Sequence, residues 1–156
     1  MGIEIERKYL VKGNQWKNLA SGLLYRQGYI ATVGKQTVRV RVVGDRGYLT
    51  IKGANVGGVR SEFEYTIPAT DAEEMLNTLC DRPLIEKIRY KIPHGDLVWE
   101  VDEFLGDNAG LVIAEVELDR ADREITLPDW IDKQVTDAKY FNSNLAKHPY
   151  SQWQDK

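Results

Sequence analysis

Strict alternation of apolar and charged residues marks the start of the chain. Residues 3–10 read IEIERKYL, with apolar side chains at positions 3, 5 and 9 and charged ones at Glu4, Glu6 and Lys8. Successive side chains of a strand point to opposite faces, so this segment is predicted to form a strand with one apolar and one charged face. Side chains two positions apart lie about 7 Å from each other. Two such carboxylates can share a divalent cation.

The same alternation recurs along the chain and predicts seven further strands. We expect them near residues 24–32, 37–43, 48–52, 61–67, 85–92, 97–104 and 111–118. Most of the connections are short enough to join antiparallel neighbours. Eight strands joined in this way favour a closed sheet.

Helical patterns are few. A short helix or turn is predicted at 14–20, a helix from a capping box at Thr70 and Glu73 to about Cys80, a helix start at 128–131, and a closing helix at 140–147. The expected fold class is therefore mainly β with a few helices (α+β), an eight-stranded antiparallel barrel with flanking helices. With 156 residues, we expect one domain over 1–156.

The faces opposite the apolar ones are almost entirely charged. The cations on them are Lys8, Arg39, Arg41, Lys52, Lys87 and Arg89, and the anions are Glu4, Glu6, Glu62, Glu64, Glu100, Asp102, Glu115 and Glu117. If these faces line one lumen, the charges repel and lose hydration in the empty site. Such a lumen suits water, divalent cations and a polyanion. The alternative is a sandwich whose charged faces look outward.

Composition narrows the function classes. The formal net charge of −3 argues against a general nucleic-acid binder. Charges in the first ten residues leave no apolar region for a signal peptide, and no apolar run approaches 18 residues. Cys80 is the only cysteine. We therefore expect a cytoplasmic protein with neither nucleic-acid nor membrane partners.

An ordered series of motifs resembles the CYTH superfamily, the triphosphate tunnel metalloenzymes. The series runs through Glu4-x-Glu6-x-Lys8, Gln27-Gly28-Tyr29, Arg39-x-Arg41, Thr50-Ile51-Lys52-Gly53, Glu62-x-Glu64, Glu86-Lys87-x-Arg89-Tyr90, Glu100-x-Asp102-x-Phe104 and Glu115-x-Glu117. The resemblance spans about residues 3–145. The chain is most similar to the short bacterial members of the family, which typically hydrolyse inorganic tripolyphosphate.

This resemblance implies a tunnel that binds a triphosphate with Mg²⁺ or Mn²⁺, two ions being expected with substrate. The implied metal ligands are Glu4, Glu6, Asp102, Glu115 and Glu117. The implied phosphate-binding residues are Arg39, Arg41, Lys52, Lys87, Arg89 and Lys139. Lys8 and Tyr29 match a catalytic pair of the short members, and Glu64 is expected to hold a second metal or orient the attacking water. Ala138 and Lys139 depart from the family's usual Lys-Arg.

Other readings of the same residues stay open. A class IV adenylate cyclase or a thiamine triphosphatase could use the same tunnel, because a fold does not fix its function. A non-catalytic polyphosphate- or nucleotide-binding module is a further alternative, although phosphate binding alone needs cations more than eight acids. Glu62 is either a site residue or a partner of an arginine. A homodimer is expected if apolar barrel faces stay uncovered.

Overall fold

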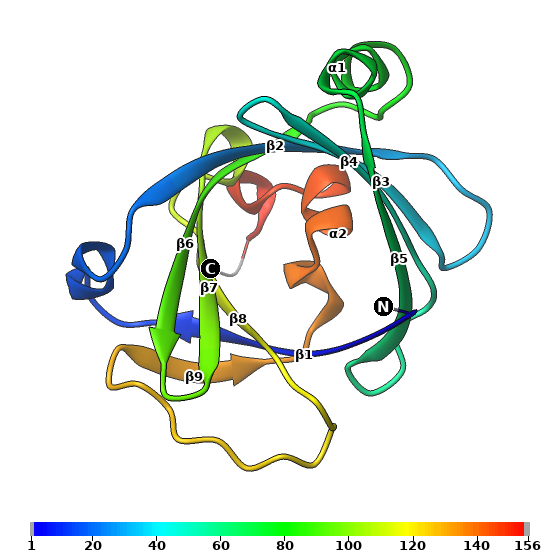
Figure 1. Cartoon of the computed structure of the whole chain (residues 1–156). Helices are drawn as coiled ribbons and strands as arrows, with labels where there is room; N and C mark the ends of the chain where they lie inside the picture. Colours follow the sequence, from blue (N-terminus) through cyan, green and yellow to red (C-terminus); the bar gives the residue numbers. More distant parts are fainter. Residues whose placement is uncertain (1, 155–156) are drawn as a thin grey trace.

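Nine antiparallel strands form one sheet that closes into a barrel in the computed structural model, which describes residues 2–154 (Figure 1). The strands are β1 (Gly2–Val11), β2 (Gly22–Ile30), β3 (Thr37–Val43), β4 (Arg46–Lys52), β5 (Val59–Ile67), β6 (Ile85–His94), β7 (Leu97–Phe104), β8 (Val112–Glu117) and β9 (Ile131–Val135). The eight expected strands are all present, and the predicted fold class is confirmed.

The ring closes through β1. One edge of β1 pairs with β8 over residues 6–10, and its first residues pair with β5, so that Gly2 lies opposite Glu62. Beyond the end of this pairing, β9 pairs with β1 from Lys8 to Val11. The strand that carries the first charged motif is thus held on both sides.

The helices are short and differ in part from those expected. They are α1 (Ala69–Thr78), α2 (Asn142–Lys147) and the 3₁₀ turns η1 (Gln15–Asn18), η2 (Gly106–Asn108), η3 (Ala138–Tyr140) and η4 (Tyr150–Gln152). Two predictions were wrong. No side chain caps α1, which begins after Pro68, so the capping box does not form. Residues 128–131 begin no helix but lead into β9, because β1 offers that segment an open edge.

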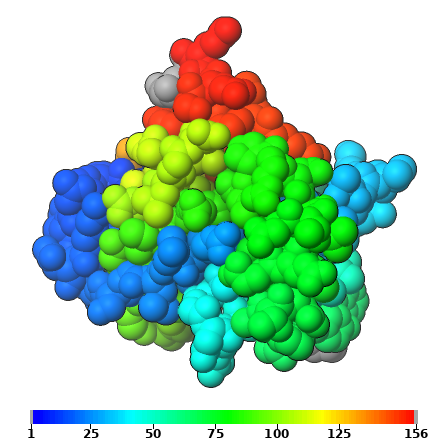
Figure 2. Space-filling view, turned by 90° about the horizontal axis from the view of Figure 1, so that it is seen from above, coloured from blue at the N-terminus to red at the C-terminus, as the bar shows by residue number. Residues whose placement is uncertain are grey.

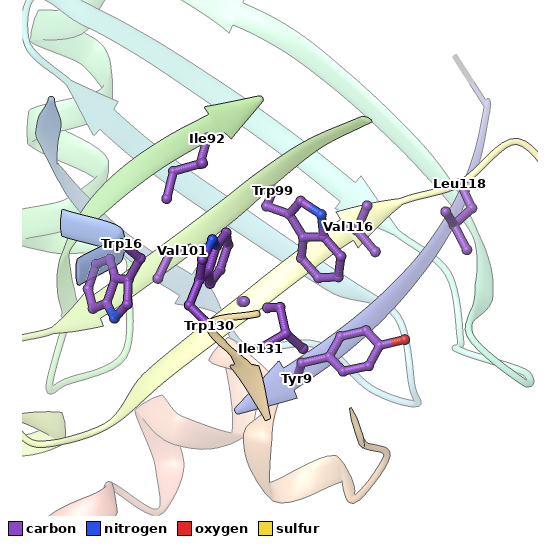
Figure 3. Packing of buried hydrophobic residues seen from close by; sticks show 10 residues of the cluster. Tyr9, Trp16, Ile92, Trp99, Val101, Val116, Leu118, Trp130 and Ile131 are labelled. Atoms are coloured by element: carbon purple, nitrogen blue, oxygen red, sulfur yellow. The ribbon is translucent and has the colours of Figure 1, made fainter. Parts of the chain in front are cut away.

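The largest apolar core lies outside the barrel wall. Trp99 and Val116 point outward from β7 and β8, and they are covered by Trp130, just before β9, and by Ile131, its first residue (Figure 3). The rings of Trp99 and Trp130 meet edge to face at 6.0 Å between centroids. A separate cluster joins α1 to the outer faces of β3 and β4. Because apolar contacts stabilise the wall from outside, the lumen is left to polar side chains.

One end of the lumen is closed by the C-terminal segment. Ile85, Phe104 and Ile113 share strand faces with the charged lumen residues, and they pack against Leu145 and Ala146 of α2. In Figure 1, α2 lies within the ring of strands, and Figure 2 shows the C-terminal residues (red) gathered at one end of the molecule. The tunnel is therefore apolar and filled at this end.

An apolar strip on the outer face of β4 and β5 stays uncovered. Phe63 is 48% exposed and Tyr65 57%, with Ile51 and Ile3 exposed beside them. The homodimer expected from such a face stays a prediction. Within residues 2–154, none of the helices has both the length and the apolar character needed to cross a bilayer.

Candidate active site

The charged strand faces meet inside the barrel around a cavity of about 290 Å³. The cavity wall includes Glu4, Glu6, Lys8, Tyr29, Arg39, Arg41, Lys52, Glu64, Lys87, Arg89, Glu115 and Glu117. Asp102 is fully buried directly beside them. Among the site residues expected from the sequence, all of which lie within residues 2–154, only Lys139 is not part of this group. A sandwich with outward-facing charges is therefore excluded.

Glu4 on β1 joins two neighbouring strands electrostatically. Its carboxylate lies 3.0 Å from the Lys52 amine of β4 and 3.1 Å from Nε of Arg60 of β5. Burial raises the pKa of Glu4, but Lys52 and Arg60 outweigh it and lower this pKa below the usual value. Glu4 is therefore ionised at neutral pH, as a cation ligand must be.

Glu6, Lys8 and Glu115 form a second group where β1 pairs with β8. The Lys8 amine lies 3.0 Å from Glu115 and 3.4 Å from Glu6. Burial and the charge of Glu115 raise the pKa of Glu6 to about 7. Although burial opposes ionisation of Glu115, Lys8 and Arg89 hold the pKa of that carboxyl well below its usual range. At neutral pH Glu115 is therefore ionised, whereas Glu6 is partly protonated, and a further cation would favour the ionised form of Glu6.

Glu62 and Glu117 add to this acidic side of the cavity. Burial and nearby Glu4 raise the pKa of both carboxyls. Glu62 lies 3.5 Å from the Lys52 amine, so it lines the site and pairs with a lysine rather than an arginine. Within residues 2–154, no lysine or arginine forms an ion pair with Glu117. Crowded acids with raised pKa values indicate a place for added positive charge.

Asp102 is the buried carboxylate between two cations of β6, Arg89 and Lys87. Its carboxylate accepts two hydrogen bonds from the Arg89 guanidinium, at 2.7 and 2.8 Å, and lies 2.8 Å from the Lys87 amine. Burial raises the pKa of Asp102, but Arg89 and Lys87 lower it below its usual value. Burial lowers the pKa of Lys87 well below its usual range despite Asp102. Asp102 is thus fully engaged by cations.

Arg39 of β3 and Glu64 of β5 are joined by hydrogen bonds to each other and to Thr50 of the intervening β4. The guanidinium Nη2 of Arg39 donates to Glu64 at 3.2 Å and to the Thr50 hydroxyl at 3.1 Å, and that hydroxyl donates to Glu64 at 2.8 Å. Nε of Arg39 is buried and has no hydrogen-bond partner within the described part of the chain. A buried donor of this kind is costly unless a ligand supplies the acceptor.

Arg41 is buried, and within the described residues 2–154 it has no ion-pair partner. Its Nε donates to the amide oxygen of Gln27 at 3.0 Å, and none of the carboxylates in residues 2–154 forms an ion pair with it. Burial and the neighbouring charges of Arg39 and Arg89 lower the pKa of Arg41 to about 9. Excess positive charge at this point favours an anion in the cavity.

The donor set fits a hard divalent cation. Glu4, Glu6, Glu115 and Glu117 supply only oxygen, the ligand that Mg²⁺ and Mn²⁺ prefer. Burial and repulsion from neighbouring carboxylates raise the pKa of Glu6 and of Glu117, and a bound cation would offset both effects. Within residues 2–154, however, no three acidic, histidine or cysteine side chains surround one common point, because lysines and arginines hold several of them.

The structure also places residues that the sequence patterns did not identify. Arg60 lines the cavity and lies one residue before the expected start of its strand at residue 61. It shares a strand face with Glu62 and Glu64, so extending the alternating pattern by one residue would have identified it. Asn142 reaches the cavity from α2, where no strand pattern applies, and accepts a hydrogen bond from Lys87 at 2.8 Å.

Lys139, which was expected to bind phosphate, lies outside the cavity wall, with its amine 4.4 Å from the Trp153 ring centroid.

The titration of Glu6 is expected to destabilise the protein in EDTA as the pH rises from about 4.5 to about 7. The pKa of Glu6 rises from 4.5 to about 7 on folding, so in this interval the folded state binds more protons than the unfolded state. The free energy of unfolding then falls as pH increases. Urea unfolding across this range measures the slope, and Glu6→Gln should flatten it. An unchanged slope in Glu6→Gln would contradict the assignment.

Comparison with known proteins agrees with this geometry. The CYTH domain family matches residues 2–150. An inorganic triphosphatase from Acetivibrio thermocellus is 53% identical, with 99% of this chain and all of that protein covered. A solved inorganic triphosphatase structure is 31% identical at a TM-score of 0.64, covering 91% of this chain and 96% of the other.

More distant structures share the fold. A Bacillus halodurans protein, whose assignment as an adenylate cyclase is provisional, has a TM-score of 0.62 at 20% identity and covers 78% of this chain and 84% of its own. At that identity the likeness concerns the barrel alone. The family match covers nearly the whole chain and coincides with the charged lumen. The chain belongs to the CYTH domain family.

Proposed function

We propose that this protein is an inorganic triphosphatase that hydrolyses the terminal phosphoanhydride of tripolyphosphate inside its barrel. The observation that carries the proposal is Arg41, a buried guanidinium with no carboxylate partner among residues 2–154. It shares the cavity with Glu6 and Glu117, whose pKa values are raised by burial and by repulsion from neighbouring carboxylates. A cation-bearing polyanion satisfies both groups, whereas a simple anion or a metal alone satisfies only one. The name of the Acetivibrio thermocellus relative supports the same activity.

The cationic residues would hold the phosphate oxygens. Arg39, Arg41 and Arg89 offer planar guanidinium groups that bind phosphate through paired hydrogen bonds, and Lys52 and Lys87 offer point charges. The narrow cavity fixes the substrate along the barrel. Because these groups are already buried and oriented by protein contacts, they stabilise developing negative charge without reorganising.

The metal requirement of the family extends to this chain in the proposal. Glu4, Glu6, Glu115 and Glu117 would hold Mg²⁺ or Mn²⁺, with two ions expected beside a bound substrate, and Asp102 would contribute only by leaving its contacts with Arg89 and Lys87. When bound, such ions neutralise phosphate charge and assist displacement of the terminal phosphoryl group.

Three residues are proposed to act at the reacting groups. Glu64, with its side chain 43% exposed, can accept a hydrogen bond from the attacking water while Arg39 and Thr50 hold it in place. Lys8 and Tyr29 line the same cavity. Lys8 forms an ion pair with Glu115, and the Tyr29 hydroxyl accepts a hydrogen bond from Gln27. Their N–H and O–H groups would donate to oxygens of the phosphoryl being transferred. Lys139 is not needed for this arrangement.

The proposal predicts metal-dependent phosphate release from tripolyphosphate that exceeds release from ATP, thiamine triphosphate and pyrophosphate. Reactions with Mg²⁺, with Mn²⁺ and with EDTA test it, and release in EDTA should fall to the no-enzyme rate. Formation of cyclic AMP from ATP would instead identify a cyclase. Tight binding of tripolyphosphate without any release would identify a binding module.

A further inference from the structure

We propose that Gln27 is a positioning residue that orients Arg41 and Tyr29 for the triphosphate while leaving the positive charge of Arg41 uncompensated. The inference rests on the proposed triphosphatase function. It assigns a role to a residue whose side-chain hydrogen bonds involve Arg41, Tyr29 and Asn142. Gln27 lies in the middle of β2 and is completely inaccessible to solvent. An amide buried so deeply must use its polar atoms on the protein.

Both ends of the Gln27 amide are engaged by groups that line the cavity. Its Oε1 accepts a hydrogen bond from Nε of Arg41 at 3.0 Å. Its Nε2 donates to the Tyr29 hydroxyl oxygen at 3.0 Å. Arginine has only donors, so the amide oxygen must face Arg41 and the amide nitrogen must face Tyr29. One side chain therefore fixes two separate groups of the site.

The neutrality of the amide determines what Arg41 can do. A carboxylate at this position would form a charge-assisted pair with the guanidinium and cancel its charge. The amide holds the guanidinium by Nε alone and leaves the charge and the terminal nitrogens for a ligand. This explains how Arg41 is ordered in the wall and yet has no ion pair among the described residues. The lumen pairs its other buried cations with acids, such as Arg89 with Asp102.

The same contact sets the direction of the Tyr29 hydroxyl. Because the oxygen accepts the Gln27 N–H, its own hydrogen is free to point toward the cavity that Tyr29 lines. Gln27 Nε2 also lies 3.4 Å from Oδ1 of Asn142, which accepts from the Lys87 amine at 2.8 Å. Displacing this amide should thus alter two donors directly and a third through Asn142.

Two substitutions of similar volume separate charge from orientation. Gln27→Glu is expected to weaken binding of tripolyphosphate in EDTA, measured by calorimetry, by at least about tenfold, and to raise KM in Mg²⁺ correspondingly. Gln27→Met removes the Nε contact of Arg41 but adds no compensating anion, so its affinity should fall less than that of Gln27→Glu. Its kcat should fall by about tenfold or more because the Tyr29 hydroxyl loses its fixed direction. Gln134→Glu, on the exposed part of β9, is the charge-matched control.

The outcomes distinguish this inference from the proposed function. Wild-type binding and KM in Gln27→Glu, or wild-type kcat in Gln27→Met, would overturn the positioning role in an active enzyme. Equal losses of kcat and affinity in both variants, together with a lowered melting temperature, would show a structural role only and also overturn it. If wild type neither binds nor cleaves tripolyphosphate, the proposed function fails, and the role of Gln27 fails with it. Should Gln27→Glu not fold, the kcat of Gln27→Met decides.

Discussion

Replacing Arg41 with methionine is expected to lower kcat/KM for tripolyphosphate by about 10²–10³-fold, the loss typical of removing one preorganised charged donor from a reacting oxyanion. The side chain is buried in the wall of the cavity, and in residues 2–154 it has no ion-pair partner whose loss could explain the effect. Phosphate release in Mg²⁺ at several substrate concentrations measures it. Arg120→Met, at a side chain that is 66% exposed, provides the control.

The same Arg41→Met substitution should leave the free protein as stable as wild type, or more stable by about 1–4 kcal/mol, because it replaces a buried uncompensated charge with an apolar chain. Burial and the charges of Arg39 and Arg89 lower the pKa of Arg41 to about 9, which shows the cost of that charge in the fold. Urea unfolding in EDTA measures the change. Activity and stability lost together would mean that Arg41 supports the fold rather than the substrate.

Replacing Asp102 with asparagine is expected to have the opposite effect on stability. The carboxylate is fully buried between Arg89 and Lys87, so among residues 2–154 the amide would leave Lys87 without an ion-pair partner and Arg89 with only its longer contacts to Glu100 and Glu115. Breaking a buried pair from one side costs about 3–5 kcal/mol of folding free energy. Urea unfolding of the metal-free protein should show a loss of this size.

The control for Asp102 is Asp132→Asn, at an exposed position on β9, which should change the free energy of unfolding by less than about 0.5 kcal/mol. If Asp102→Asn is as stable as wild type, the aspartate is not the anion that holds these cations. It would then be available as a metal ligand, as the sequence resemblance implies.

The opposite signs of these two effects follow from how the lumen is charged. Asp102 is placed to satisfy cations in the empty protein, whereas Arg41 is left unsatisfied until a ligand arrives. A site of this kind gives up stability in return for ligand binding. The acids behave in the same way, since Glu4 is paired with Lys52 and Arg60 while Glu117 has no cation partner among residues 2–154.

Several features of the fold could be predicted because alternation acts locally. A period of two places Glu4, Glu6 and Lys8 on one strand face whatever the neighbours are, and hairpin turns such as that at Gly44, with φ of +60°, join antiparallel partners. The segment that becomes β9 lacked such a pattern. It is a strand only because β1 leaves an edge free beyond its pairing with β5.

Side-chain parity in a strand depends on spacing alone, so the sequence predicted the barrel, its charged faces and the residue types that we propose for a metal-bound polyanion. The tertiary structure sets which charges neutralise one another. It paired Asp102 with Arg89 and Lys87, left Arg41 to the neutral amide of Gln27, brought Asn142 of α2 into the lumen and left Lys139 outside. These pairings join residues up to 55 positions apart, such as Lys87 and Asn142, and they depend on strand order and on where the chain re-enters the barrel.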